Sequence, residues 1–154
     1  MGWVTLSLRK LTLKAEINDL NFQDIQLSRQ VRHIHRHLSY EQSIYETDRT
    51  RELTDARQKL KDARKDRPNV GDAGYAEWQA NYAKAKEDYE EQVQYIEDYY
   101  DDIKEELEKE AQDQETAIQE QQTIIETQRD AMNAELEAIT EEVKNEIQNS
   151  AIKF

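Results

Sequence analysis

A stripe of mainly apolar residues from Leu6 to Leu38, in alternating steps of four and three, most constrains how this chain can fold. Its ten positions are Leu6, Lys10, Leu13, Ile17, Leu20, Asp24, Leu27, Val31, Ile34 and Leu38. This spacing lines side chains along one face of a helix and is typical of a coiled-coil seam. Because eight of the ten positions are apolar, the stripe predicts a helix packed lengthwise against another helix.

Further apolar residues make this stripe wider than a single seam. They are Leu8, Leu11, Ala15, Phe22 and Ile25. A wide stripe indicates that the helix contacts more than one neighbour. Past Leu38 the seam is less regular, and Ser39–Gln42 has the pattern of a capping box, so a restart of the helix there stays open.

The segment 67–74 contains the only proline of the chain and two of its three glycines. Such residues supply the fixed or positive φ at which a helix stops, so we expect a turn there. A first helix of about 5–66 would precede it, and a second of about 75–154 would follow. Apolar residues nearly vanish between 108 and 116, so an interruption of the second helix at that point stays open.

These elements predict an all-α fold, with residues 1–154 forming a single elongated helical-hairpin domain, an antiparallel coiled coil. The composition agrees, because 36% of residues are charged and cysteine is absent, which is usual for long helices. Residues 1–67 hold 14 basic and 10 acidic residues, whereas residues 68–154 hold 7 and 24. A basic helix beside an acidic one favours the hairpin over the pairing of like helices.

Several functional classes find no support in the sequence. Paired carboxylates act as general acid and base only in a pocket, which a hairpin does not offer, so we expect no enzymatic activity and no cofactor. The net charge of -13 argues against binding to nucleic acid. No stretch approaches the roughly 20 apolar residues of a membrane span, and the N-terminus lacks the order of a Sec signal peptide.

All three histidines lie together, at His33, His35 and His37. His33 and His37 would sit one helical turn apart, a spacing that can hold zinc when a carboxylate accompanies it. The expected glutamate between them is missing, and Arg32 and Arg36 would repel a cation. We therefore assign no metal ligand and favour a solvated face, with protonation that tunes assembly near neutral pH as the alternative.

Apolar residues near both ends of the chain are the candidate self-assembly interface. They are Leu6, Leu13, Ile17, Leu20, Ile139, Val143, Ile147 and Phe154. Burial of stripes that one hairpin cannot cover alone would drive assembly into a filament or tube. The aromatic residues Tyr75, Trp78, Tyr82 and Tyr89 have seam spacing, so packing is the first interpretation and a partner surface the second.

Two segments, Arg67–Gln79 and Val143–Phe154, resemble the turn and the C-terminal helix of type III secretion needle and filament subunits. Those subunits are helical hairpins whose turn contains proline and asparagine. The resemblance implies that the terminal helices pack in a filament, that an export or assembly apparatus is a partner, and that the subunit leaves the cell without a cleaved signal peptide. This chain is longer than a needle subunit, so it would be an enlarged relative.

Two other functions stay open from the sequence. The first is a scaffold component of a virion or other complex, which needs a different protein to cover its apolar stripes. The second is a cytoplasmic tether or chaperone-like binding module that offers its tyrosine-rich face to a client. The cellular location therefore depends on the function, and is the cell surface or exterior only for a filament subunit.

Overall fold

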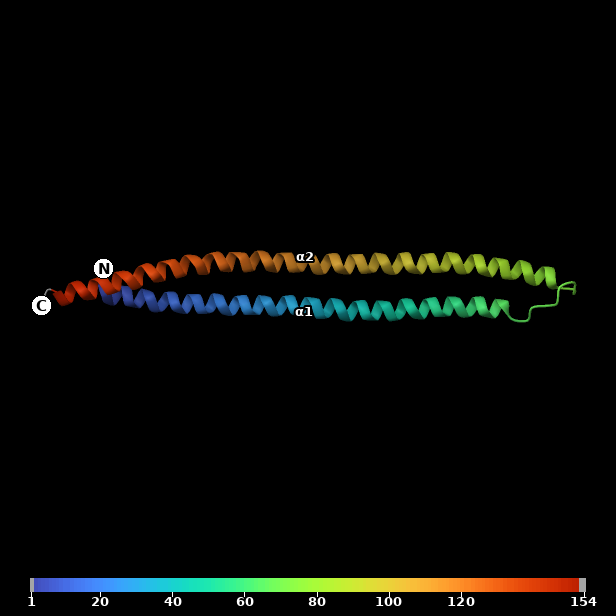
Figure 1. Ribbon diagram of the computed structural model, residues 1–154, viewed down its shortest axis with the longest axis horizontal. Helices are drawn as coiled ribbons and strands as arrows, with labels where there is room; N and C mark the ends of the chain where they lie inside the picture. The colour runs from blue at the N-terminus through green and yellow to red at the C-terminus, as the bar shows by residue number, and fades with distance from the viewer. Residues whose placement is uncertain (1, 153–154) are drawn as a thin grey trace. The chain divides into compact units, whose positions relative to one another are not determined.

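The computed structural model describes residues 2–152, which form two α-helices joined by a turn (Figure 1). Helix α1 spans Trp3–Arg64 and helix α2 spans Tyr75–Ile152. The two helices pack against each other in opposite directions, so the predicted all-α helical hairpin is confirmed. Residues 39–42 and 108–116, where the sequence leaves the continuity open, are helical.

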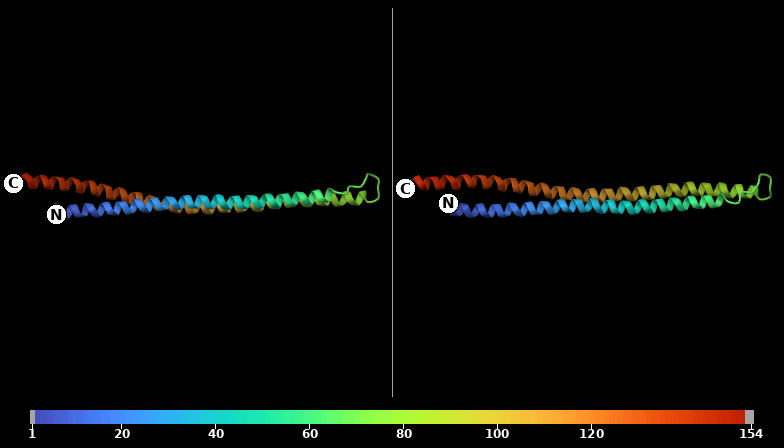
Figure 2. Two further views of the ribbon diagram at one scale, coloured as in Figure 1. Left: turned by 90° about the horizontal axis from the view of Figure 1, so that it is seen from below. Right: turned by 60° about the horizontal axis from the view of Figure 1, so that its bottom comes forward.

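Backbone hydrogen bonds and φ angles show where α1 ends and α2 begins. The Lys65 N–H donates to the Asp62 carbonyl at 3.2 Å, and Asp66 has a positive φ of 59°, so the chain leaves the helix. Gly74, with φ of 96°, adopts a conformation that costs glycine little, and its carbonyl accepts the first hydrogen bond of α2 from Trp78 N–H at 2.9 Å. Figure 2 shows the segment between the helices as a loop that reverses the chain.

The hairpin divides into two compact units, each of which contains part of both helices. The terminal unit consists of the chain up to His35 and from Gln112 onward. The turn unit consists of Arg36–Ala111. Each unit has its own kind of contact between α1 and α2.

The terminal unit is held together by an aliphatic seam. Its buried residues form two clusters, Leu20, Leu27, Ile118 and Ile125 in one, and Leu6, Leu13 and Ile139 in the other. Leu13 is completely buried. Val31, Ile34, Met132, Leu136 and Val143 are partly buried and pack against these clusters. Burial of aliphatic side chains is therefore what joins α1 to α2 in this unit.

One polar layer interrupts the aliphatic seam. Arg129 of α2 donates from Nη1 to Asn21 Oδ1 at 2.9 Å and lies 3.9 Å from the Asp24 carboxylate. The two charged side chains are about one-third exposed, so water still screens them. The pairing explains how Asp24 can occupy a seam position that the sequence otherwise fills with apolar residues.

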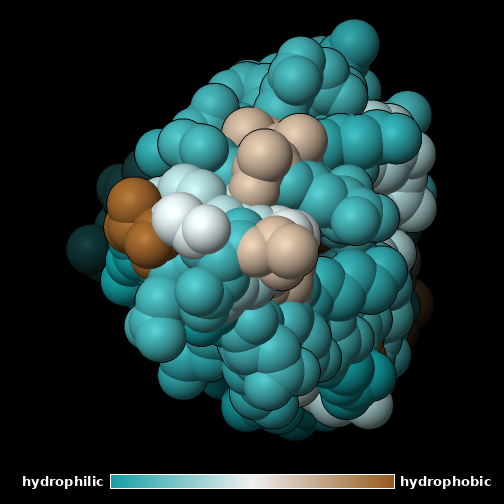
Figure 3. Space-filling view, turned by 90° about the vertical axis from the view of Figure 1, so that its right-hand side faces the viewer, coloured by the Kyte–Doolittle hydropathy of each residue, from teal (hydrophilic) through white to brown (hydrophobic). Residues whose placement is uncertain are grey.

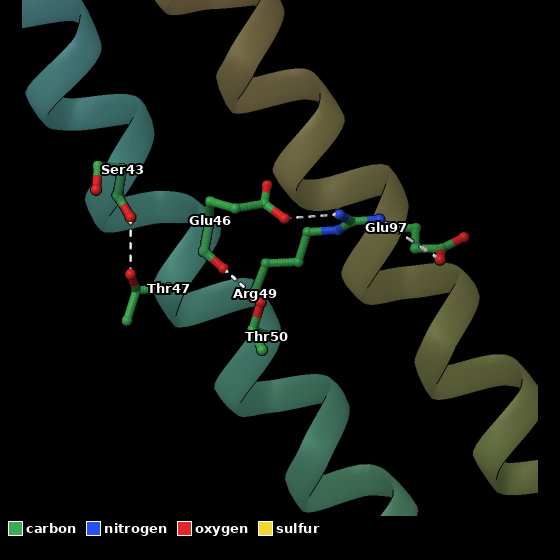
Figure 4. A network of polar contacts seen from close by, with 6 residues as sticks. All are labelled: Ser43, Glu46, Thr47, Arg49, Thr50 and Glu97. Atoms are coloured by element: carbon green, nitrogen blue, oxygen red, sulfur yellow. Dashed lines mark hydrogen bonds and ion pairs between the residues drawn. The ribbon is translucent and has the colours of Figure 1, made fainter.

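The turn unit has fewer buried side chains and more charge along its seam. Ala56, Ile96 and Tyr100 are its buried hydrophobic residues. Arg49 of α1 lies between two carboxylates, with Nη1 3.2 Å from Glu46 of the same helix and Nη2 3.6 Å from Glu97 of α2 (Figure 4). In this unit a small residue, one isoleucine, a tyrosine ring and an ion-pair network thus take the place of a continuous aliphatic seam.

Candidate interaction surfaces

Large hydrophobic side chains are exposed in both units, but more of them lie in the terminal unit. Those of the terminal unit are Trp3, Val4, Leu8, Leu11, Phe22, Ile25, Ile124 and Ile147. Those of the turn unit are Tyr40, Ile44, Val70, Tyr95 and Tyr99. Apolar residues that gather on one exposed face commonly mark a contact site for another protein. The surface at the turn itself is mostly hydrophilic, with small separate apolar areas (Figure 3).

Most of the exposed apolar residues of α1 belong to one line, here called the outer stripe. It consists of Val4, Leu8, Leu11, Ala15, Asn18, Phe22 and Ile25, all exposed. From the sequence, five of these residues are expected to widen the seam of Leu6, Leu13, Leu20 and Leu27, here called the inner seam, and to indicate a second neighbour for the helix. Their own steps of four and three show a separate stripe, and this spacing is the signal that could have identified it before the structure was known.

The predicted assembly residues fall into four groups. Leu6, Leu13, Leu20 and Ile139 are buried between α1 and α2, and Ile17 and Val143 are half-buried. Ile147 is exposed, and Phe154 lies outside the described residues. The buried side chains are not accessible to a second subunit while the hairpin is closed. Among the described members of the set, Ile147 is thus the exposed one that a second subunit could contact. The assembly role of the set stays a prediction.

The aromatic residues at the start of α2 stack on one another and on the turn. The Trp78 ring lies 6.1 Å from the Tyr75 ring and 5.4 Å from the Tyr82 ring, measured between centroids. The Arg67 guanidinium lies 5.5 Å from the Trp78 centroid, and Trp78 Nε1 donates to the Lys65 carbonyl at 3.4 Å. These half-buried rings pack the turn against α2. Their role as a partner surface, like that of half-buried Tyr89, stays a prediction.

Another pair of aromatic residues in α2, Tyr95 and Tyr99, is more exposed than the four predicted ones. Tyr95 and Tyr99 stack with their centroids 6.2 Å apart, and their exposed fractions are 70% and 48%. Tyr99 also meets buried Tyr100 edge to face at 5.1 Å. In the sequence, Tyr95, Tyr99 and Tyr100 follow the four predicted aromatic residues of the same helix. The sequence does not separate the exposed rings from the buried one, because that depends on where α1 lies.

Two grooves beside the seam differ in their chemistry. A groove of about 400 Å³ in the terminal unit is lined by five glutamines, Gln23, Gln26, Gln30, Gln121 and Gln128, together with Leu27, Ile124 and Ile125. Amides form hydrogen bonds but do not transfer protons at neutral pH. A groove of about 530 Å³ in the turn unit is lined by charged side chains, including Glu52, Asp55, Lys59 and Asp62.

The shifted pKa values follow from contacts that belong to the fold. Burial, followed by the charge of Glu52 and a hydrogen bond with it, raises the pKa of Tyr100. Hydrogen bonds from Lys65 and Gln58 lower the pKa of Asp62. A bidentate contact with Glu135, with distances of 3.0 and 3.2 Å, raises the pKa of Arg9. These shifts therefore do not single out a catalytic group.

His35 and His37 lie beside carboxylates. His35 Nε2 lies 3.0 Å from Glu115 Oε2 of α2. His37 Nε2 lies 2.8 Å from Glu41 Oε1 on its own helix. Within residues 2–152, no group of three or more His, Cys, Asp or Glu side chains is arranged to hold a metal ion.

Comparison of the chain with protein-family models, curated proteins and solved structures gives no match. The resemblance to needle and filament subunits thus rests on the turn and the C-terminal segment of the sequence. In the described part of the chain, neither helix contains a stretch long and apolar enough to cross a membrane.

Proposed function

We propose that this chain is a structural, non-enzymatic subunit that assembles with copies of itself into a filament or tube. The observation that carries the proposal is the surplus of apolar surface on the terminal unit. Its seam is already closed by buried leucines and isoleucines, yet eight large hydrophobic side chains remain exposed. Assembly would remove this surface from water, which is favourable in proportion to the apolar area buried.

The location of the apolar surface supports a polymer built through the terminal helices. Exposed residues occur on both helices of the terminal unit, on the outer stripe of α1 and at Ile124 and Ile147 of α2. A subunit with apolar contacts on two elements can bind a neighbour through each. The resemblance of Val143–Phe154 to filament subunits points the same way, and on this proposal an export or assembly apparatus is the second partner.

The test is electron microscopy of the negatively stained full-length chain beside the double variant Ile147→Asp/Phe154→Asp. We expect polymers from the unmodified chain and none from the variant, while circular dichroism shows that both stay helical. The matched control is Gln148→Asp/Asn149→Asp, which adds the same two charges to the same segment but keeps its apolar residues. Polymers that persist in Ile147→Asp/Phe154→Asp would refute this role of the C-terminal segment.

The exposed Tyr95–Tyr99 pair favours a second candidate, a binding module for a different protein. Tyrosines that are exposed together supply much of the energy of many protein interfaces. On this alternative the unmodified chain forms discrete particles at every concentration. Replacement of both tyrosines with serine would then weaken capture of the client and leave the particle size unchanged.

A further inference from the structure

The outer stripe has the geometry of a second coiled-coil seam. Its five large apolar residues are between 51% and 63% exposed, whereas the inner leucines Leu6, Leu13, Leu20 and Leu27 are at most 8% exposed. At 100° per residue, the outer stripe lies about 150° around α1 from the inner seam. It therefore faces away from α2 for a length of roughly 30 Å, or three heptads.

The charges around the outer stripe permit a second copy of the same helix. Residues 4–25 hold three basic and three acidic side chains, so this stretch has no net charge to repel its copy. Lys14 flanks the stripe on one side and Asp19 on the other, and both are exposed. The remaining flanking positions from Thr5 to Ser28 are neutral and polar.

The spacing of Lys14 and Asp19 selects a parallel arrangement. In a parallel two-stranded coiled coil, a residue on one flank faces the residue five positions later on the opposite flank of the partner. Lys14 of each copy would then face Asp19 of the other, giving two ion pairs. In an antiparallel pair each flank meets the same flank of the partner, so neither ion pair forms.

Asn18 favours the parallel arrangement for a second reason. It is the polar member of the outer stripe, and burial of an amide without a hydrogen-bond partner is costly. In a parallel pair in register, the two Asn18 side chains lie side by side in one layer of the seam and can form a hydrogen bond with each other. In an antiparallel pair Asn18 would face a different residue, Ala15 where residues 8–25 of the two copies overlap or Leu8 where residues 4–22 overlap.

From these features we infer that the outer stripe binds the outer stripe of a second copy, parallel and in register. This inference rests on the proposed function and names one contact within it. A contact that pairs the same surface on both copies closes on itself. The pair is therefore the unit from which a polymer grows through other surfaces, among them the segment that contains Ile147.

The first test uses the absence of cysteine from the chain. Mild oxidation of the Asn18→Cys variant should produce a disulfide-linked dimer in most of the sample. The matched control is Gln23→Cys, an exposed position on another face of α1, which should remain largely unlinked. Efficient linkage of Asn18→Cys chains to Ala15→Cys or Leu8→Cys chains in a mixture, exceeding that of either chain alone, would indicate an antiparallel pair and overturn the inference.

The second test reverses the charges. Lys14→Asp should weaken the dimer about 3- to 30-fold in sedimentation equilibrium, because each lost ion pair becomes a repulsion. Lys14→Asp combined with Asp19→Lys should restore the dimer, since the pairs re-form with opposite polarity. Equal weakening by the single and double variants would contradict the parallel arrangement.

Carrying out both tests in the Ile147→Asp/Phe154→Asp background separates this inference from the proposed function. Dimers with charge rescue in that background support the parallel pair whether or not the unmodified chain forms polymers. If the unmodified chain forms polymers but Asn18→Cys does not form the linked dimer, the proposed function stands and the outer-stripe pair is refuted. A chain that remains a monomer in every form refutes both.

Discussion

The terminal unit and the turn unit contain the same two helices but join them by different means. Seven buried leucines and isoleucines close the seam of the terminal unit, whereas the turn unit buries Ala56, Ile96 and Tyr100. The terminal unit has 8 basic and 13 acidic residues, and the turn unit, of nearly equal length, has 13 and 21. The unit with the stronger apolar seam is also the one with more apolar residues exposed.

Apolar residues on these helices can either pack α1 against α2 or remain exposed to other molecules, and the two units differ in this respect. In the turn unit, buried and half-buried apolar side chains lie between α1 and α2, and charged residues make up much of the remaining surface. In the terminal unit α1 has apolar side chains on two faces, of which α2 covers only one. This arrangement supports the proposal that the terminal unit supplies the contacts between molecules while the turn unit remains a solvated, charged segment.

The largest expected effect on stability comes from shortening a buried side chain of the inner seam in the terminal unit. Leu13→Ala should lower the free energy of unfolding by about 2–5 kcal/mol, because Leu13 is fully buried and the hairpin fills the cavity only in part. The matched change in the turn unit is Leu53→Ala, at a half-buried position, and should cost less. Urea unfolding followed by circular dichroism measures both, and equal costs would remove the energetic difference between the units.

A smaller effect is expected from overfilling the seam of the turn unit. Ala56 is only 2% exposed, so Ala56→Leu should push the helices apart and cost about 1–3 kcal/mol. Ala80→Leu, at an exposed position of α2 in the same unit, is the control and should change the unfolding free energy by less than about 0.5 kcal/mol. If Ala56→Leu stabilises the protein, the seam there has unfilled space.

The smallest expected effect is a pH dependence from Tyr100. Its pKa is raised in the folded protein, so the folded state holds the phenol proton more tightly than the unfolded state. The resulting stabilisation is fully present below the ordinary tyrosine pKa of about 10 and is lost as the pH rises through the folded-state value. As the pH rises from about 8 to about 11, the free energy of unfolding of Tyr100→Phe should therefore fall less than that of the unmodified protein.

Urea unfolding at several alkaline pH values measures this difference. Tyr95→Phe is the control, because it removes a phenol at an exposed position of the same unit. Parallel pH profiles for all three proteins would show that burial in the turn unit does not hold the Tyr100 proton.

Much of the fold follows from local features of the sequence. The heptad spacing of Leu6, Leu13 and Leu20 indicates a helix with a seam, and Pro68 and Gly74 mark where the chain must reverse. These features act through neighbouring residues, so they are readable without a structure. The sequence of 108–116 leaves the continuity of the helix open, because a solvated helix can continue through charged residues with almost no apolar residue among them.

The sequence by itself therefore determined the helices, the turn and the antiparallel hairpin, because helical periodicity and backbone restriction are local properties. Only the tertiary structure decided which of two stripes with the same spacing meets α2, burying Leu13 and exposing Leu11. The same holds for Asp24, whose place in the seam depends on Arg129, more than a hundred residues later. Burial is a property of two segments distant in the chain, so spacing within either one cannot settle it.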